Sequence, residues 1–154
     1  MLRDVSLRPL SREHQHGLAL CVRLRRSIQR GNLSGGDLEH MREDVRGFYD
    51  SEGARHFAAE EQVLFPAADR FSELRPLTEQ LRAEHRELRS RVAVIGEADA
   101  ELLLEFAEML SRHIRSEENE LFEKMQALIP AEELHALAKP IETAVGGAQC
   151  SLSS

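Results

Sequence analysis

Apolar residues recur every three or four positions along four long stretches of this chain. That spacing places them on one face of an α-helix, as in helices that pack around a shared core. Short segments rich in glycine or proline separate the stretches, and such residues interrupt helices. The predicted helices run from about Ser11 to Arg30, from Asp37 to Phe65, from Leu77 to Ile95 and from Ala100 to Leu128.

A shorter helix is predicted after the four long ones. Pro130 precedes it, and Pro140 marks its end or a break after about Lys139. The length of 154 residues suits one domain, and the abundance of Leu, Ala, Glu and Arg favours helices. We therefore expect an all-α fold, an antiparallel up-down-up-down four-helix bundle with a short C-terminal helix. The predicted domain spans residues 1–145, and residues 146–154 are expected to form a disordered tail.

Histidine and glutamate interrupt the apolar faces of these helices in a repeated arrangement. Two phrases place a histidine four residues before a glutamate, so that both side chains share one helical face, about 6 Å apart along the axis. Two further histidines directly follow a glutamate. The same half-site therefore occurs twice, as Glu13-His14 with His56-Phe-Ala-Ala-Glu60-Glu61, and as Glu84-His85 with His113-Ile-Arg-Ser-Glu117-Glu118.

The four histidines lie at matching distances from the predicted turns. In an antiparallel bundle, two residues equidistant from a turn lie at the same height. The midpoint of His14 and His56 is residue 35, within the glycine-rich turn. The midpoint of His56 and His85 falls between residues 70 and 71, and that of His85 and His113 is residue 99. We therefore expect all four histidines to occupy one layer of the bundle.

A buried layer of imidazoles and carboxylates needs partners, because each unpaired polar group would cost roughly a few kcal/mol. A single buried histidine is more often a hydrogen-bonded core residue than a ligand. The combined set instead predicts a metal site, since metal ions bind neutral imidazole and ionised carboxylate. Six ligands exceed a tetrahedral site and two glutamates can bridge, which favours two ions over one. The predicted ligands are His14, His56, Glu60, His85, His113 and Glu117.

Composition and charge exclude several classes of protein. The net charge is −7 and the arginines are interspersed with glutamates, which argues against nucleic-acid binding. The sequence contains neither an apolar run of membrane-spanning length nor a signal-peptide pattern. Cys21 lies in a predicted helix and Cys150 in the predicted tail, so we expect no structural disulfide and a cytoplasmic location.

The histidine and glutamate phrases resemble the hemerythrin-like, or HHE cation-binding, domain. The resemblance covers roughly residues 8–138, and includes Val-Leu-Phe-Pro66 after the first His-x-x-x-Glu and Glu-Leu-Phe122 after the second. It implies a four-helix bundle that holds an oxo- or hydroxo-bridged, non-haem di-iron centre. By this resemblance the four histidines named above are iron ligands, and Glu60 and Glu117 are bridging carboxylates.

One departure from the family pattern concerns the third helix. Oxygen-carrying hemerythrins have five histidine ligands, with a His-x-x-x-His on this helix. Here the positions four residues before and after His85 are Leu81 and Arg89. The missing histidine argues against reversible oxygen carriage and favours redox chemistry. Glu52, one turn before His56, is a candidate for a further oxygen ligand.

Three other polar residues lie near the predicted ligands. Glu61 and Glu118 are rotated by about 100° from the bridging positions, so we expect them outside the ligand set or exposed. Classical hemerythrins, however, use the longer spacing that Glu118 would satisfy. His16 is rotated by about 200° from His14 and is not expected to face the same centre.

The sequence favours a non-haem di-iron protein that binds oxygen or a related small diatomic, for sensing, iron handling or redox protection. One alternative is a di-iron oxidase or peroxidase acting on oxygen, peroxide or nitric oxide. Another is an iron-responsive interaction module whose folding depends on metal supply. The sequence distinguishes neither the native metal nor a protein partner, and it leaves open whether the protein is an enzyme.

Overall fold

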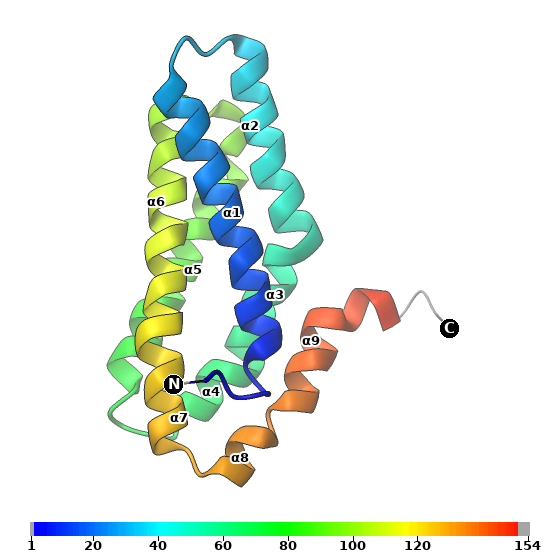
Figure 1. The fold of residues 1–154 in the computed structure, drawn as a ribbon, viewed down its shortest axis with the longest axis vertical. Coiled ribbons are helices and arrows are strands. Elements are labelled where there is room, and N and C mark those ends of the chain that lie inside the picture. The colour runs from blue at the N-terminus through cyan, green and yellow to red at the C-terminus, as the bar shows by residue number, and fades with distance from the viewer. Residues whose placement is uncertain (1, 151–154) are drawn as a thin grey trace.

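Four long helical segments run antiparallel and form a bundle (Figure 1), in a computed structural model that describes residues 2–150 and the side chains through residue 146. The first segment is α1 (Arg8–Arg30) and the third is α5 (Arg75–Ala93). The second is a continuous series, α2 (Gly35–Phe48), η1 (Tyr49–Gly53), α3 (Ala54–Ala59), η2 (Glu60–Leu64) and α4 (Phe65–Asp69). The fourth joins α6 (Ala100–Ser116), η4 (Glu117–Leu121) and α7 (Phe122–Leu128), after the short η3 (Ile95–Glu97). The predicted all-α bundle is confirmed.

The helix starts differ from the prediction where proline or serine begins the helix. α1 and α5 begin three and two residues before their predicted starts, each with a proline in the first turn, where the missing N–H has no intrahelical partner to lose. The second segment is capped by Ser34 rather than by Asp37. Ser34 accepts a hydrogen bond from the Asp37 N–H, and the Asp37 carboxylate accepts one from the Ser34 N–H, which is a capping box.

Three π-helical turns interrupt the second and fourth segments at η1, η2 and η4, where uninterrupted α-helix was predicted. In η2 and η4 the carbonyls of Glu60 and Glu117 accept hydrogen bonds from N–H groups five residues later. The wider turn lets two consecutive large residues face the interior. Leu64 and Phe65, at the junction of η2 and α4, are fully buried, as are Leu121 and Phe122 at the junction of η4 and α7. Such turns often mark functional sites.

The core consists of two apolar clusters separated by a polar layer. One cluster includes Leu10 and Leu81, and the other includes Leu20 and Leu88. Buried histidines lie between these leucines on α1 and α5, at positions 14 and 85. The polar layer is therefore enclosed by apolar side chains on both sides.

The C-terminal helices pack beside the bundle end that carries α4 and α7. α8 (Ala131–His135) is followed by α9 (Ala138–Cys150), which contacts α3, η2 and α1. Ile141 is fully buried, and the Arg55 Nε donates to the Val145 carbonyl at 3.2 Å. The helix is broken close to the predicted place, between His135 and Ala138, but Pro140 does not end it, because this proline lies in the first turn of α9, where a missing N–H is tolerated.

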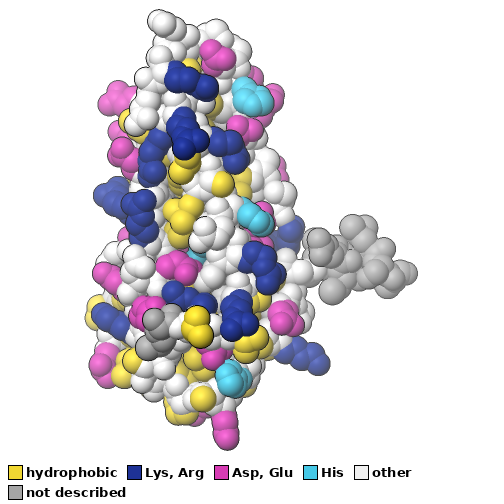
Figure 2. Space-filling view, in the orientation of Figure 1, with side chains coloured by type: hydrophobic (Ala, Val, Ile, Leu, Met, Phe, Trp, Pro, Cys, Tyr) yellow, Lys and Arg dark blue, Asp and Glu magenta, His cyan; other side chains and the backbone are white. Residues whose placement is uncertain are grey.

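The predicted tail at residues 146–154 overlaps the last residues of α9, and residues 151–154 lie outside the described part of the chain. The domain boundary at residue 145 stays a prediction. Among the described helices, none is long and apolar enough to cross a membrane. On the face shown in Figure 2, basic, acidic and histidine side chains are interspersed over α1 and the neighbouring segments.

Candidate metal centre

Six side chains from all four segments meet in the polar layer of the bundle. The histidines come from α1, α3, α5 and α6, and the two glutamates begin the π-helical turns η2 and η4. All six are buried, with exposed fractions between 0% and 6%. They are the six predicted ligands, His14, His56, Glu60, His85, His113 and Glu117.

These side chains form two groups that share both glutamates. One group contains His14 and His56, the other contains His85 and His113, and Glu60 and Glu117 belong to both. Within each group the candidate ligand atoms lie within 4.8 Å of one another. The structure thus contains two adjacent four-residue sets that could hold metal ions, joined by two carboxylates.

Glu60 directs its two oxygens to different groups. Its Oε2 lies 3.2 Å from the His56 Nε2, and its Oε1 lies 3.0 Å from the His85 Nε2. Glu117 places Oε1 at 3.3 Å from the His14 Nε2 and at 3.0 Å from the His113 Nε2. Both carboxylates can therefore contribute to both groups.

Several of these buried polar atoms have no hydrogen-bond partner. They are the Glu60 Oε2, both carboxylate oxygens of Glu117 and the His113 Nε2. The Nε2 atoms of His14 and His56 also lie 3.0 Å apart. When both rings are neutral and protonated on Nδ1, both Nε2 atoms present lone pairs, which repel without a cation between them. Metal ions held between these side chains would satisfy these atoms, so the residues present fit a metal centre.

A second set of carboxylates orients the four imidazoles. Each accepts a hydrogen bond from the Nδ1 of a histidine on another segment, at distances of 2.6 to 2.9 Å. This bond fixes the tautomer and leaves Nε2 to face the centre. The pairs are Glu13 with His56, Glu61 with His85, Glu84 with His113 and Glu118 with His14. We call these four glutamates the outer carboxylates.

Two of the outer carboxylates are Glu61 and Glu118, which the sequence analysis expected to lie outside the ligand set or to be exposed. Neither belongs to the two ligand groups, and each binds a histidine on another segment, at 2.7 Å and 2.6 Å respectively. Sequence reasoning assigned no role to Glu13 and Glu84. The available signal was their position directly before His14 and His85.

Glu52 and His16 form a separate pair. The His16 Nδ1 donates to the Glu52 Oε1 at 2.6 Å, and neither residue belongs to a ligand group. Glu52 as a further ligand is therefore not supported. As expected, His16 does not join the histidine layer, because its ring is 57% exposed.

Leu81 and Arg89 occupy the positions where a fifth histidine ligand would complete the family pattern, and both make contacts of a different kind. Leu81 is fully buried in an apolar cluster. Arg89 donates to both oxygens of Glu61, at 2.7 and 3.0 Å. Glu118 is held in a similar way, since the Arg3 Nη2 lies 3.2 Å from its Oε1. The arginines thus hold two of the outer carboxylates, and neither Leu81 nor Arg89 belongs to a ligand group.

Nearby carboxylates raise the pKa values of His56 and His113, although burial acts in the opposite direction. Burial lowers the pKa of His56, but the charge of Glu60, 3.2 Å away, and the hydrogen bond with Glu13 outweigh it and raise the pKa to about 9. Burial likewise opposes the charged form of His113, yet the charge of Glu117, 3.0 Å away, and the hydrogen bond with Glu84 raise its pKa to about 10. The nearby carboxylates thus favour the protonated forms of both histidines.

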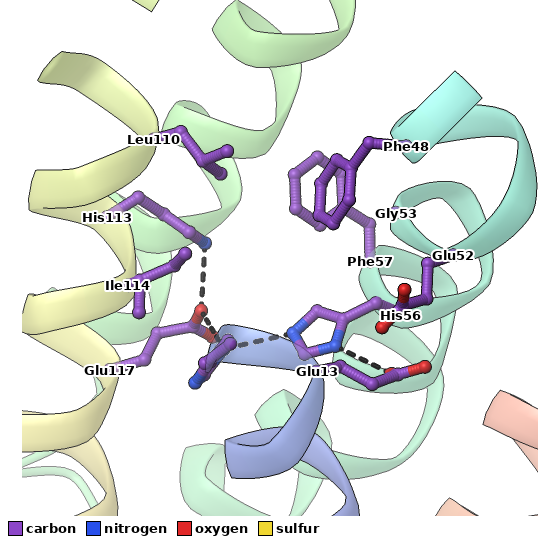
Figure 3. A pocket seen from close by; sticks show the side chains of 11 residues that line it. Glu13, Phe48, Glu52, Gly53, His56, Phe57, Leu110, His113, Ile114 and Glu117 are labelled. Atoms are coloured by element: carbon purple, nitrogen blue, oxygen red, sulfur yellow. Dashed lines mark hydrogen bonds and ion pairs between the residues drawn. The ribbon is translucent and has the colours of Figure 1, made fainter. Parts of the chain in front are cut away.

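A small cavity adjoins the polar layer (Figure 3). Its volume is about 20 Å³, enough for roughly one water-sized molecule. Phe48, Phe57, Leu110 and Ile114 form its apolar walls, and we call it the inner cavity. His56 faces it from one side, and His113 and Glu117 from the opposite side.

Gly17 on α1 leaves room for the walls of the inner cavity. A Cβ at this position would lie 2.9 Å from the Ile114 Cδ1 and 3.4 Å from the Phe48 Cζ. The first distance is shorter than a van der Waals contact, so a side chain here would displace a wall of the cavity.

Comparison with protein families identifies the class of this chain. The model of the hemerythrin HHE cation binding domain matches residues 5–125. The chain therefore belongs to the hemerythrin HHE cation-binding family, as its motifs predicted. Neither the curated proteins nor the solved structures contain a significant match.

Proposed function

We propose that the protein binds two iron ions in the polar layer. His14 and His56 would hold one ion, His85 and His113 the other, and Glu60 and Glu117 would bridge them. The observation that carries this proposal is the pair of four-residue groups with two shared, buried carboxylates. Imidazole and carboxylate ligands together suit iron, whereas structural zinc sites favour four closed tetrahedral ligands, often including cysteine.

The charges around the site support two divalent ions. Glu60 and Glu117 neutralise half of the charge of two such ions, while four neutral imidazoles contribute none. The outer carboxylates supply further negative charge within one imidazole of the centre. Arg3 and Arg89 limit that excess by pairing with Glu118 and Glu61. The balance suits a cationic pair better than a single ion.

We further propose that the inner cavity receives oxygen or a related small diatomic, for sensing, iron handling or redox protection. Its volume of about 20 Å³ suits a molecule of that size, and Phe48, Phe57, Leu110 and Ile114 make part of its wall apolar. Bound iron would supply open coordination positions and one-electron chemistry at this cavity. A cytoplasmic location forms part of the proposal, because Cys21 is a free, buried thiol.

A redox enzyme acting on oxygen, peroxide or nitric oxide is the second candidate. It is favoured by the equal ligand sets of the two groups, each with two histidines and the same two glutamates. Since neither group has an extra nitrogen ligand, both ions would keep open positions. A third reading, an iron-responsive interaction module, would require the fold itself to depend on metal.

Metal analysis of protein purified without added metal tests the leading proposal. We expect about two iron ions per chain, as the two ligand groups imply. A single tightly bound zinc ion, or no bound metal after anaerobic incubation with ferrous iron, would contradict it. Circular dichroism with and without chelator separates the third reading, which alone requires the helices to unfold on metal removal.

A further inference from the structure

The six candidate ligands are too deeply buried for an ion to reach them directly. Their exposed fractions are only 0% to 6%. A route must therefore pass through side chains that line both the surface and the inner cavity. Two residues do so, since Phe48 and Glu52 line the inner cavity and also a surface groove between α1 and the second segment. We call this groove the outer groove.

A hydrogen bond lies where the outer groove meets the inner cavity, because one of its two partners, Glu52, lines both. The Nδ1 of His16 on α1 donates to the Oε1 of Glu52 on η1 at 2.6 Å. Glu52 is 23% exposed and His16 is 57% exposed, so the pair lies between surface and interior. Breaking this one contact would free the Glu52 carboxylate without disturbing a ligand.

Carboxylates occur at each stage of the path. Glu43 and Asp44 line the outer groove, with Arg23 as the only arginine or lysine in its lining. Glu52 follows at the boundary, and Glu13 lines the inner cavity and hydrogen-bonds His56. In Figure 3, Glu52 and Glu13 lie on the same side of the cavity as His56. Successive carboxylate oxygens are suitable transient ligands for a divalent cation that exchanges its hydration shell.

The path ends at buried atoms that need a cation. Both oxygens of Glu117 and the Nε2 of His113 have no hydrogen-bond partner, and both residues line the inner cavity. The acidic groove is thus connected, through two shared side chains, to the unpartnered polar atoms of the centre.

A second surface groove approaches the centre but fits a cation less well. It lies between α5 and α6 and contains Glu84, the outer carboxylate of His113. Its lining combines three carboxylates with two arginines, whereas the outer groove has three carboxylates and one arginine. The second groove also shares no lining residue with the inner cavity. Its charge and its separation from the cavity both favour the path through Glu52.

We propose that Glu52 is the entry site for divalent metal ions, and that His16 holds it closed. An ion collects in the outer groove, exchanges with the Glu52 carboxylate as His16 releases it, and passes along Glu13 to the ligand groups. This inference rests on the proposed metal-binding function. It adds a role for residues outside the ligand sets.

The rate of metal loading tests the entry site. Metal-free protein is mixed anaerobically with ferrous iron or Co²⁺ in a stopped-flow instrument, and the final number of ions per chain is measured on the same samples. Glu52→Gln keeps the size and removes the charge, so we expect several-fold slower loading with unchanged final stoichiometry. His16→Ala frees Glu52, so we expect loading faster than in the unmodified protein. Glu87→Gln, in the second groove, is the matched control and should load normally.

The two proposals fail in different ways. Absence of bound ions in the unmodified protein at the end of the reaction would refute the metal centre itself. Two bound ions with unchanged loading rates in Glu52→Gln would overturn the entry site and leave the centre intact. Equal slowing by Glu52→Gln and Glu87→Gln would also overturn it, because the effect would then reflect surface charge in general. Circular dichroism of each variant verifies that the bundle is folded.

Discussion

Glu13 and His56 are 43 residues apart in the chain, yet the Glu13 Oε1 lies 2.9 Å from the His56 Nδ1. Glu13 directly precedes His14, so one residue pair in α1 supplies a candidate ligand to the centre and orients the ligand of α3. Glu84 has the same relation to His85 and His113. Together with Glu61 and Glu118, these contacts link every segment to the next around the bundle, because each segment carries one glutamate that orients a neighbouring histidine.

The outer carboxylates should affect metal affinity without contributing a ligand. Glu84→Gln removes the charge that holds the His113 Nδ1–H and weakens its Nε2 as a donor. We expect metal affinity to fall by about 10- to 100-fold, measured by competition with a chelator of known affinity. Glu87→Gln, three residues further along the same helix, should bind as the unmodified protein does. Equal affinities in both variants would mean that Glu84 does not orient a ligand.

The histidine ligands should affect stoichiometry. His56→Ala and His113→Ala each remove one nitrogen from a different group, so we expect each to lose about half of the bound metal. His40→Ala is the matched control, since the His40 side chain is 76% exposed and far from the layer in sequence. Elemental analysis gives the number of ions per chain. Full metal content in both core variants would refute the ligand assignment.

Much of this candidate site could be predicted from the sequence because two pairs of its residues each lie within one helical segment. The spacing from His56 to Glu60 and from His113 to Glu117 is one helical turn, which sequence shows directly. The shared height of the histidines followed from the turn positions. Fold class and family were likewise predicted correctly, because both depend on local periodicity and motif.

The outer carboxylates and the π-helical turns could not be predicted in the same way. Glu118 and His14 are 104 residues apart, and no periodic pattern reports a contact between side chains of different helices. The π-helical turns at Glu60 and Glu117 depend on packing two successive large residues against the core, which is a tertiary effect. The helix end was placed at Pro140 for a different reason. Proline is compatible with the first turn of a helix as well as with the residues that follow a helix.

Metal should stabilise the fold more strongly as the pH rises. In metal-free protein, the raised pKa values of His56 and His113, about 9 and about 10, mean that their protonated forms stabilise the native state. That contribution is full below the unfolded value of about 6.5 and is lost as the pH rises towards 9 and 10. Metal binding instead requires neutral imidazole and strengthens over the same range.

We therefore expect the gain in Tm on metal loading to be larger at pH 8.5 than at pH 6.5, measured by thermal circular dichroism with and without chelator. His56→Ala should show a smaller change between the two pH values. A gain in Tm that is constant or falls with pH would contradict the exchange of protons for metal.

Oxygen chemistry should reflect the missing nitrogen ligand on α5. The positions four residues before and after His85 differ in their contacts. Arg89 donates two hydrogen bonds to Glu61, whereas Leu81 is buried one turn before His85. With oxygen or water ligands in place of a nitrogen, the ferric state is favoured. We expect the reduced protein to oxidise rapidly in air, without a lasting oxygen adduct, as followed by stopped-flow absorption. Leu81→His should slow this oxidation, and Leu81→Met, which retains an apolar side chain of similar size, should not. A stable and reversible oxygen complex in the unmodified protein would instead establish it as an oxygen carrier.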